Sequence, residues 1–408
     1  MKYVKRFVEF YLLFYFIVFT GYRYQMADPM ILQILTLIIM VIMVGWLVYL
    51  LISKESPGLP PNPGVYLLYA GFYLTSVFHS VDHHYSIPEG FLYFIAMLLF
   101  VGILSLVRYG YSRRDLLNSL LLVGAVYSVM KAVQLPQVYG GWNFRECLPR
   151  GVLVPNVSAG FLGMVSVVSL SIWLWRGDKK EWLAFGTFVV SALTVFVIGS
   201  RGGYIGTIAG IAVVLLLRII ITGEFSRMAV VLVFSMLLFM PIVGSMVVRQ
   251  PTCETIIDEE VAVRDSRAWT GNVTVRYDFW DTAFDIFREY PVFGAGPGGY
   301  TAIAGPIYEY RNATWHSHNL YLNILAERGA VGFIMSAVVL FVLVRAILKQ
   351  PDPVYKLIGC GAIMVILGQG LVDVVVYEPL VMRYYFAILA VAVGPNLVKG
   401  KVLNAENN

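Results

Sequence analysis

The stretch of residues 182–222, WLAFGTFVVSALTVFVIGSRGGYIGTIAGIAVVLLLRIIIT, decides the fold. Two apolar runs of helix length stand on either side of a short polar segment, Gly199-Ser200-Arg201-Gly202. Each run approaches the roughly 20 residues that an α-helix needs to cross the hydrocarbon core of a bilayer. The stretch therefore predicts two membrane-spanning helices joined by a tight turn.

The same pattern recurs along the whole chain. Apolar runs of helix length cover residues 7–23, 30–52, 65–79, 91–107, 116–134, 157–175, 182–199, 203–222, 228–248, 330–348, 356–377 and 383–398. Of the 408 residues, 59% are hydrophobic and 13% are charged, whereas soluble chains carry roughly 25% charged residues. We expect an all-α integral membrane protein with about twelve transmembrane helices.

The runs divide the chain into three parts. Residues 1–248 hold nine predicted spans, 249–329 form one long outer loop with short amphipathic helices, and 330–408 hold three further spans and the C-terminus. No small-residue cleavage site follows the first apolar run, so we interpret it as an uncleaved span. Cys147 and Cys253 both fall on the outer side, where a disulfide between them is possible.

The distribution of lysine and arginine predicts the orientation. With the N-terminus in the cytoplasm, 17 of the 30 basic residues fall in the seven cytoplasmic segments, and both termini lie inside. The basic residues on the cytoplasmic side are nine lysines and eight arginines, but those on the outer side are twelve arginines and one lysine. Arginine binds phosphate through a planar, two-pronged set of donors. This excess indicates an anionic substrate on the outer side, although arginine also tolerates interfaces well.

Arg201 lies in the turn that joins the two spans of the opening stretch. It is placed at the outer membrane boundary, where a charge is costly unless it is paired or bound. The glycines that follow allow close approach of the backbone, and the exposed N–H groups of the next helix favour an anion. The alternative is a tight turn with a snorkelling arginine.

A second constellation lies in the long outer loop. Residues 275–290 have the periodicity of an amphipathic helix, with Arg276 in its first turn and Pro291 at its end. The run Phe293-Gly294-Ala295-Gly296-Pro297-Gly298-Gly299-Tyr300 follows. It lacks the strand and the lysine of a phosphate loop, so we interpret it as a sharp, close-packed turn.

A third constellation is Trp315-His316-Ser317-His318-Asn319. A helix from about His318 to Arg328 would end at Gly329, since glycine suits a helix C-terminus. A neutral imidazole at the mouth of the helical bundle can take a proton from an attacking hydroxyl. His318 is therefore the candidate base and His316 a supporting residue, and the alternative is a pair of interfacial histidines.

A fourth group, His79, Asp82, His83 and His84, contains two histidines one helical turn apart. Such a spacing can hold a metal. No further ligand completes the set, so a hydrated loop is the favoured interpretation. Asp373 and Lys131 are the ionisable residues placed well inside predicted spans.

These motifs resemble those of the O-antigen ligase and polymerase superfamily of bacterial envelopes. The similar segments are Ser200-Arg201-Gly202-Gly203, Arg276 with Trp280, Pro291 to Pro297, Gly151-Val152-Leu153-Val154-Pro155-Asn156, and His318-Asn319 followed by nine residues and Gly329. The last spacing is that of the ligases. The matches run from about residue 145 to 335, and the resemblance implies an architecture like that of GT-C glycosyltransferases.

The resemblance also implies a reaction. Such enzymes transfer a glycan from undecaprenyl pyrophosphate, at the periplasmic face of the inner membrane, to a lipid A core sugar (ligases) or to another lipid-linked repeat (polymerases). They use no nucleotide and no metal, and they bind membrane lipids but no nucleic acid. Arg201 and Arg276 would hold the pyrophosphate, and His318 would activate the acceptor.

Four further residues enter through the same resemblance. Arg145 or Arg150 would supplement the binding of pyrophosphate, and His316 and Asn319 would contact the substrate. Direct attack would invert the anomeric centre, since no carboxylate nucleophile is evident. A twelve-span transporter or flippase for a lipid-linked oligosaccharide is the alternative from another class, but it should place more charges near the middle of the membrane.

Overall fold

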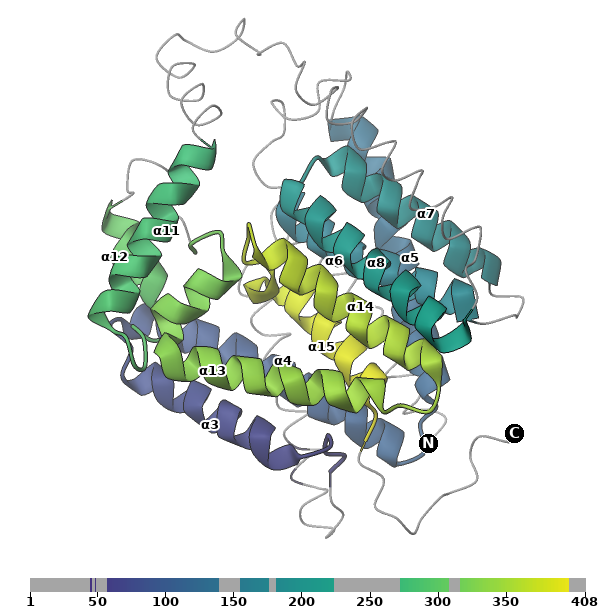
Figure 1. Cartoon of the computed structure of the whole chain (residues 1–408), viewed down its shortest axis with the longest axis horizontal. Helices are drawn as coiled ribbons and strands as arrows, with labels where there is room; N and C mark the ends of the chain where they lie inside the picture. Colours follow the sequence, from purple (N-terminus) through teal and green to yellow (C-terminus); the bar gives the residue numbers. More distant parts are fainter. Residues whose placement is uncertain are drawn as a thin grey trace, which may run out of the picture.

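The computed structural model describes residues 57–138, 155–175, 181–223, 272–307 and 316–395, together with Gly45 and Val48. The described elements are all helical (Figure 1). They are α3 (Pro63–Phe78), α4 (His83–Arg108), α5 (Arg113–Val138), α6 (Pro155–Trp175), α7 (Glu181–Ile198), α8 (Arg201–Thr222), α11 (Asn272–Glu289), α12 (Gly299–Ile307), α13 (Leu320–Leu348), α14 (Pro353–Gly370), the 3₁₀ turn η2 (Val375–Tyr377) and α15 (Pro379–Val393).

Six of the described helices, α4, α5, α6, α8, α13 and α14, are long and apolar enough to cross a membrane. Three shorter apolar helices, Pro63–Phe78, Trp182–Ile198 and Pro379–Val393, accompany them. Nine of the expected spans thus coincide with described helices, and the chain is a multi-pass membrane protein. The runs 7–23, 30–52 and 228–248 lie outside the described residues, so the count of twelve stays a prediction.

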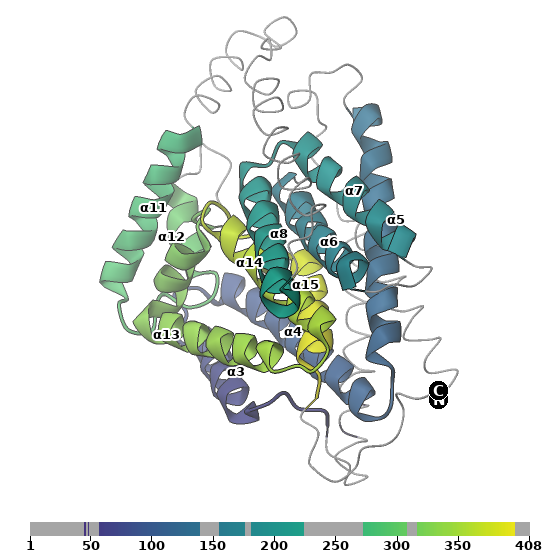
Figure 2. The same cartoon turned by 45° about the vertical axis from the view of Figure 1, so that its right-hand side comes forward.

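The helices α6, α8, α14 and α15 form the centre of the molecule (Figures 1 and 2). Without water to drive apolar surfaces together, membrane helices associate through close packing of small residues. Gly206, Gly210 and Gly361 provide that packing here, because a Cβ on any of them would collide with the facing helix. We call α6, α7, α8, α14 and α15 the bundle unit.

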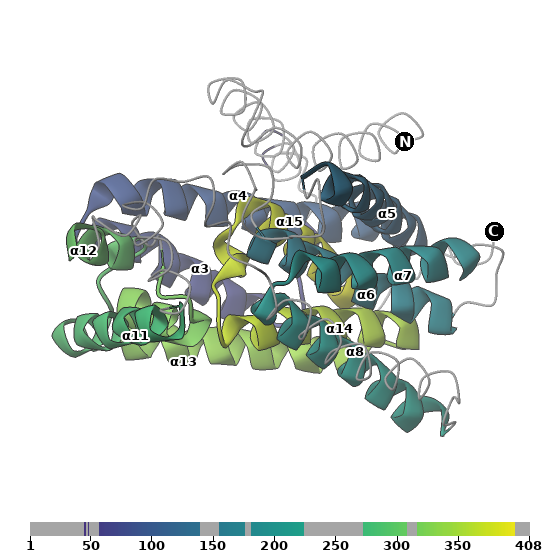
Figure 3. The same ribbon diagram turned by 90° about the horizontal axis from the view of Figure 1, so that it is seen from above.

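The second region consists of α11, α12 and the first half of α13, which we call the outer unit. In all three overall views α11 and α12 stand beside the beginning of α13, away from α5 and α7 (Figures 1–3). Their shared core includes Phe279, Ala283, Ile286, Tyr300 and Ala326. The amphipathic helix expected over 275–290 is α11, and it begins three residues earlier. Arg276 therefore lies in its second turn and not its first.

Gly329 interrupts α13 with non-helical dihedral angles, φ 61° and ψ −169°. The helix expected to end at Gly329 and the span expected to begin at Ala330 thus meet at a kink within one element. The glycine run folds against this kink through four backbone hydrogen bonds, which we call the buckle. They are Ala295 N–H to Ala326 O (2.9 Å), Gly296 N–H to Glu327 O (2.9 Å), Ala330 N–H to Pro291 O (2.9 Å) and Val331 N–H to Val292 O (3.1 Å).

The buckle explains why glycine recurs in both motifs. Gly294 has φ 73° and Gly329 has φ 61°, a left-handed region that favours glycine. A Cβ on Gly294 would collide with the backbone of Glu327 and Arg328, and one on Gly329 with the backbone of Val292. The sharp, close-packed turn expected from the glycine run is therefore confirmed. The turn packs against the kink in α13, and its hydrogen bonds satisfy backbone groups that have no helical partner at the kink.

Candidate active site between the bundle and outer units

The polar turn before α8 is built as a helix N-terminus. Ser200 caps α8, since its Oγ accepts from Gly203 N–H at 3.1 Å and donates to Asn156 Oδ1 at 2.8 Å. Gly202 and Gly203 leave room for α14 and α6, because a Cβ on Gly203 would collide with Ala159. Arg201, the first residue of the helix, is exposed at this end of the bundle. The expected close approach of the backbone is confirmed.

Asn156 shows why the Pro-Asn motif accompanies the turn. It stands at the beginning of α6, where its side chain accepts from Ser200 and its backbone carbonyl accepts from Gln369 Nε2 at 2.8 Å. Gln369 belongs to α14 and is fully buried. The N-terminal ends of α6 and α8 are thus tied to the C-terminal end of α14, and this tie fixes where Arg201 stands.

Arg276 approaches from the other unit. Burial lowers the pKa of Arg276, the negative charge of Asp373 opposes that change, and the positive charge of Arg201 adds to it. Two arginines from different helices are therefore close enough to repel each other. An anion bound between them would relieve this repulsion, and guanidinium groups suit phosphate.

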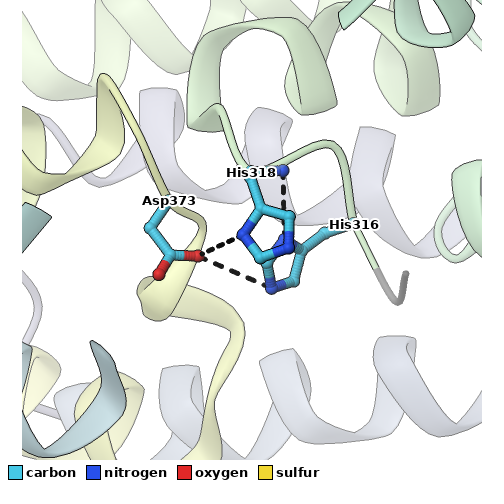
Figure 4. Close-up of side chains that lie close together, drawn as sticks. All are labelled: His316, His318 and Asp373. Carbon is cyan, nitrogen blue, oxygen red and sulfur yellow. Dashed lines mark hydrogen bonds and ion pairs between the residues drawn. The ribbon is translucent and has the colours of Figure 1, made fainter. Parts of the chain in front are cut away.

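Asp373, whose charge acts on Arg276, also lies against the ring of His318. His318 Nδ1 stands 3.2 Å from Asp373 Oδ1 (Figure 4). Since a carboxylate accepts, this contact places the proton on Nδ1 and leaves Nε2 as the basic atom. Among the residues that the structure describes, none forms a hydrogen bond with Nε2. Phe279 of α11 stacks on the ring, with centroids 5.7 Å apart.

The backbone of His318 has φ 53°, a left-handed conformation that residues other than glycine rarely adopt. The neighbouring residues hold it in place. Ser317 Oγ donates to Asn319 O at 2.8 Å, and Asn319 caps α13 by accepting from Tyr321 N–H and Leu322 N–H. Asn319 Nδ2 donates to Leu371 O at 3.1 Å. Strained backbone of this kind is concentrated at functional sites.

Asp373 is the functional residue that the sequence reasoning misplaced. We expected it well inside a span over 356–377, but α14 ends at Gly370 and Asp373 lies in the irregular segment before η2. Beyond the helix end, Asp373 Oδ1 accepts from its neighbour Val374 N–H at 2.8 Å, a local bond of the kind that competes with helical pairing. An ionisable residue in an apolar run is itself a functional signal, and it would have identified this residue.

Several donors keep Asp373 ionised although its side chain is only 4% exposed. Burial acts to raise the pKa of this carboxyl. The hydrogen bond from His318, the charges of His316 and His318, and the Val374 N–H together outweigh burial, so the pKa lies below its ordinary value. An ionised Asp373 holds the His318 ring in one orientation and stabilises the imidazolium that forms when Nε2 takes a proton.

His316 faces the same carboxylate oxygen at 3.7 Å through Nε2. Burial lowers the pKa of His316 to about 4, with further contributions from His318 and Asp373, which act in opposite directions. His316 Nδ1 accepts from the His318 N–H at 3.2 Å. His316 is therefore neutral near pH 7, with its proton on Nε2, and it supports His318 as the sequence predicts.

Within the described part of the chain, His316, His318 and Asp373 are also the group that could hold a metal ion. The hydrogen bonding does not fit a metal. A metal on His316 Nε2 requires the proton on Nδ1, and that proton would face the His318 N–H, donor against donor. The nearby charges of Arg276 and Arg201 also disfavour a cation.

The remaining predicted residues divide into two groups. His79, Asp82, His83 and His84 do not assemble into a ligand set: Asp82 caps α4 by accepting from His84 N–H, and the His83 ring contacts Val77 O. Arg145 and Arg150, as well as the possible Cys147–Cys253 disulfide, lie outside the described residues, and their roles stay predictions.

Comparison with known proteins agrees with this geometry. The O-antigen ligase family model matches residues 186–337, a segment that contains Arg201, Arg276 and His318. The match supports the O-antigen ligase superfamily for this segment of the chain. It also supports a function of the O-antigen ligase or polymerase type in general.

A curated protein is also similar to part of the chain. An uncharacterized protein of Haemophilus influenzae (strain Rd) is 22% identical over 194 residues, which are 46% of this chain and 48% of that protein. The chain thus spans about half the length of this curated relative. Within the matched segment, His318 contacts Asp373, and the charge of Asp373 acts on Arg276.

Proposed function

We propose that this protein transfers a glycan from undecaprenyl pyrophosphate to a sugar of the lipid A core, at the periplasmic face of the inner membrane. The observation that carries the proposal is a histidine whose Nδ1 is held by Asp373, together with Arg276, on which the charges of both Asp373 and Arg201 act. This arrangement combines a site for a dianionic leaving group with a base for a hydroxyl.

The arginines would bind the donor pyrophosphate. As the glycan C1–O bond breaks, negative charge grows on the departing phosphate oxygen, and guanidinium groups already in place stabilise it. Because Arg201 belongs to α8 and Arg276 to α11, donor binding would also hold the two units together. Arg145 or Arg150 would add to this binding.

His318 would act on the acceptor. Its Nε2 takes the proton of the attacking sugar hydroxyl as the new C1–O bond forms. Asp373 stabilises the resulting imidazolium through Nδ1, and in the neutral ring it fixes the tautomer in which Nε2 carries the free lone pair. Attack from the side opposite the pyrophosphate inverts the anomeric centre, and the proton then leaves to water. No nucleotide or metal takes part in this scheme.

Reconstitution in liposomes tests the function. The purified chain would receive an undecaprenyl-pyrophosphate glycan together with lipid A core, with a second lipid-linked repeat unit, or with neither. We expect a new glycan–core product and free undecaprenyl pyrophosphate with the first acceptor only. Lengthening of the lipid-linked chain would make the protein a polymerase, and movement of intact donor across the bilayer would make it a flippase.

Matched variants locate the reaction at the proposed site. Arg276→Ala should abolish transfer, whereas Arg288→Ala should leave it intact. Both arginines belong to α11, but Arg288 is exposed and pairs with Asp285 at 2.9 Å. Equal activity of the two variants would remove Arg276 from the pyrophosphate site, even if wild-type protein transfers glycan.

A further inference from the structure

A line of buried polar side chains runs from the His318 loop along one face of α13. Ser317, Asn323 and Glu327 have exposed fractions of 0%, 1% and 1%. Asn323 Oδ1 accepts from Ser317 N–H at 3.0 Å, so it holds the residue between the two histidines. Asn323 and Glu327 are four residues apart and therefore lie above each other on the helix.

The Glu327 carboxyl lies at the end of this line. This carboxyl interacts with the Asn323 side-chain amide and with the backbone N–H of Tyr300. It also lies within range of the charges of Glu89 and Arg328. Neither Glu327 carboxyl oxygen nor Asn323 Nδ2 reaches regular hydrogen-bond geometry with a described residue. A buried carboxyl in an apolar setting is costly, and an ionisable residue in a membrane helix is a functional hypothesis by default.

The orientation of the Asn323 amide links this carboxyl to the site. An amide can present either its oxygen or its NH2 group to Ser317 N–H, but only the oxygen can accept. When the Asn323 oxygen accepts from Ser317 N–H, the NH2 group is left for Glu327 one helical turn away, and a carboxyl oxygen of Glu327 can accept from it. The carboxyl thereby fixes the hydrogen bond that supports the left-handed backbone of His318.

We propose that Asn323 and Glu327 are positioning residues for His318, which fix its loop through Ser317 although neither touches substrate. The proposal rests on the proposed function, in which His318 is the base. The buckle uses the backbone carbonyl of Glu327 and leaves its side chain without a role. The proposal gives that side chain one.

A swap of donor and acceptor tests the proposal. Asn323→Asp places two carboxyls against each other, and we expect kcat to fall at least tenfold while the KM for the lipid-linked donor changes less than twofold. Adding Glu327→Gln restores a donor opposite the new carboxylate and still leaves an oxygen for Tyr300 N–H. The double variant should regain activity to within about threefold of wild type, above Asn323→Asp alone.

The loop itself gives a readout that does not depend on glycan transfer. Carbethoxylation of His318 by diethylpyrocarbonate, followed by mass spectrometry in detergent without substrate, reports its exposure and protonation, with exposed His84 as the internal reference. We expect the relative rate to change in Asn323→Asp and to return toward the wild-type rate in the double variant.

The outcomes separate the two proposals. If wild-type protein shows no transfer but the modification rates follow the swap, the proposed function fails and the positioning of the loop stands. If wild-type protein transfers glycan but the double variant is no more active than Asn323→Asp, and its modification rate does not recover, the positioning role is wrong.

Discussion

The bundle unit and the outer unit meet at the active site, but they are held together in different ways. In the bundle unit, α8 packs against α6 and α14 through glycines such as Gly206 and Gly210 and through apolar side chains. In the outer unit, the glycine run is joined to α13 by backbone hydrogen bonds, and ionisable groups such as Glu327 and Arg328 are buried.

This difference in how the two units are held together corresponds to the site residues that each unit contributes. The bundle unit supplies Arg201 at a helix end, which close packing and the Ser200–Asn156–Gln369 hydrogen bonds fix, and Asp373 in the segment after α14. The outer unit supplies Arg276 and His318, whose loop has a strained backbone and therefore needs specific hydrogen bonds to hold it. The site is complete only when both units are in place. The following predictions test this division.

The largest effect is expected from His318→Ala. Loss of the base should reduce the rate of glycan transfer by about 10²–10⁴-fold, the usual contribution of a positioned general base. Initial rates in liposomes with saturating donor would measure it, and unchanged elution on size exclusion would show that the protein folds. Wild-type rates would move the base to another residue and leave the arginine site untouched.

Arg201→Ala and Arg276→Ala should each reduce transfer by about 10²–10³-fold, since each removes one preorganised charge at the leaving group. The two substitutions come from opposite units, so similar losses would show that both units bind the pyrophosphate. Competition by inorganic pyrophosphate provides the binding measurement, and Arg288→Ala is the control. A loss confined to one variant would place the pyrophosphate site within one unit.

Gly329→Ala should destabilise the outer unit by about 2–3 kcal/mol, because the new Cβ needs a left-handed backbone and collides with Val292. Gly71→Ala in α3 is the matched control, since a Cβ there meets nothing within 4 Å. Thermal unfolding in detergent would compare the two. Equal midpoints would show that the buckle does not limit stability.

Asp373→Asn should reduce kcat by about 10–10²-fold without changing donor KM, because an amide cannot stabilise the imidazolium through charge. We expect an effect on kcat and not on KM because Asp373 contacts the base His318. A rise in KM with unchanged kcat would instead assign Asp373 to donor binding through Arg276, whose pKa it also affects.

The smallest effect concerns pH and His316. The folded protein takes up a proton at His316 only near pH 4, whereas an unfolded histidine does so near pH 6.5. Between these values the unfolded state binds more protons, so stability should fall as pH is lowered from about 6.5 to about 4.

His316→Gln should flatten this part of the stability curve, as measured by unfolding midpoints across the pH range. His84→Gln, which alters an exposed histidine, should leave the curve unchanged. The same slope in wild type and in His316→Gln would assign the acid sensitivity to another group.

The sequence by itself determined the membrane class and the positions of nine helices, and it predicted three candidate site residues. Apolar runs and glycine spacings are local, so they can be recognised along the chain. The scarcity of histidine and the excess of arginine on one side indicated Arg201, Arg276 and His318 before any contact was known. The motif around Asn156 was recognised, but its purpose, to hold Ser200, was not.

Only the tertiary structure decided which residues face one another. Asp373 reads as part of an apolar helix, and it reaches His318 only because α14 ends early and its following segment turns toward the outer unit. Glu327 likewise reads as part of a helix boundary until Asn323 and Ser317 are seen to line up with it. The His318–Asp373 contact joins residues 55 positions apart, and the Asn156–Gln369 contact joins residues 213 positions apart. Helix periodicity aligns Asn323 with Glu327, but it does not encode these long-range contacts, because they depend on how separate helices pack.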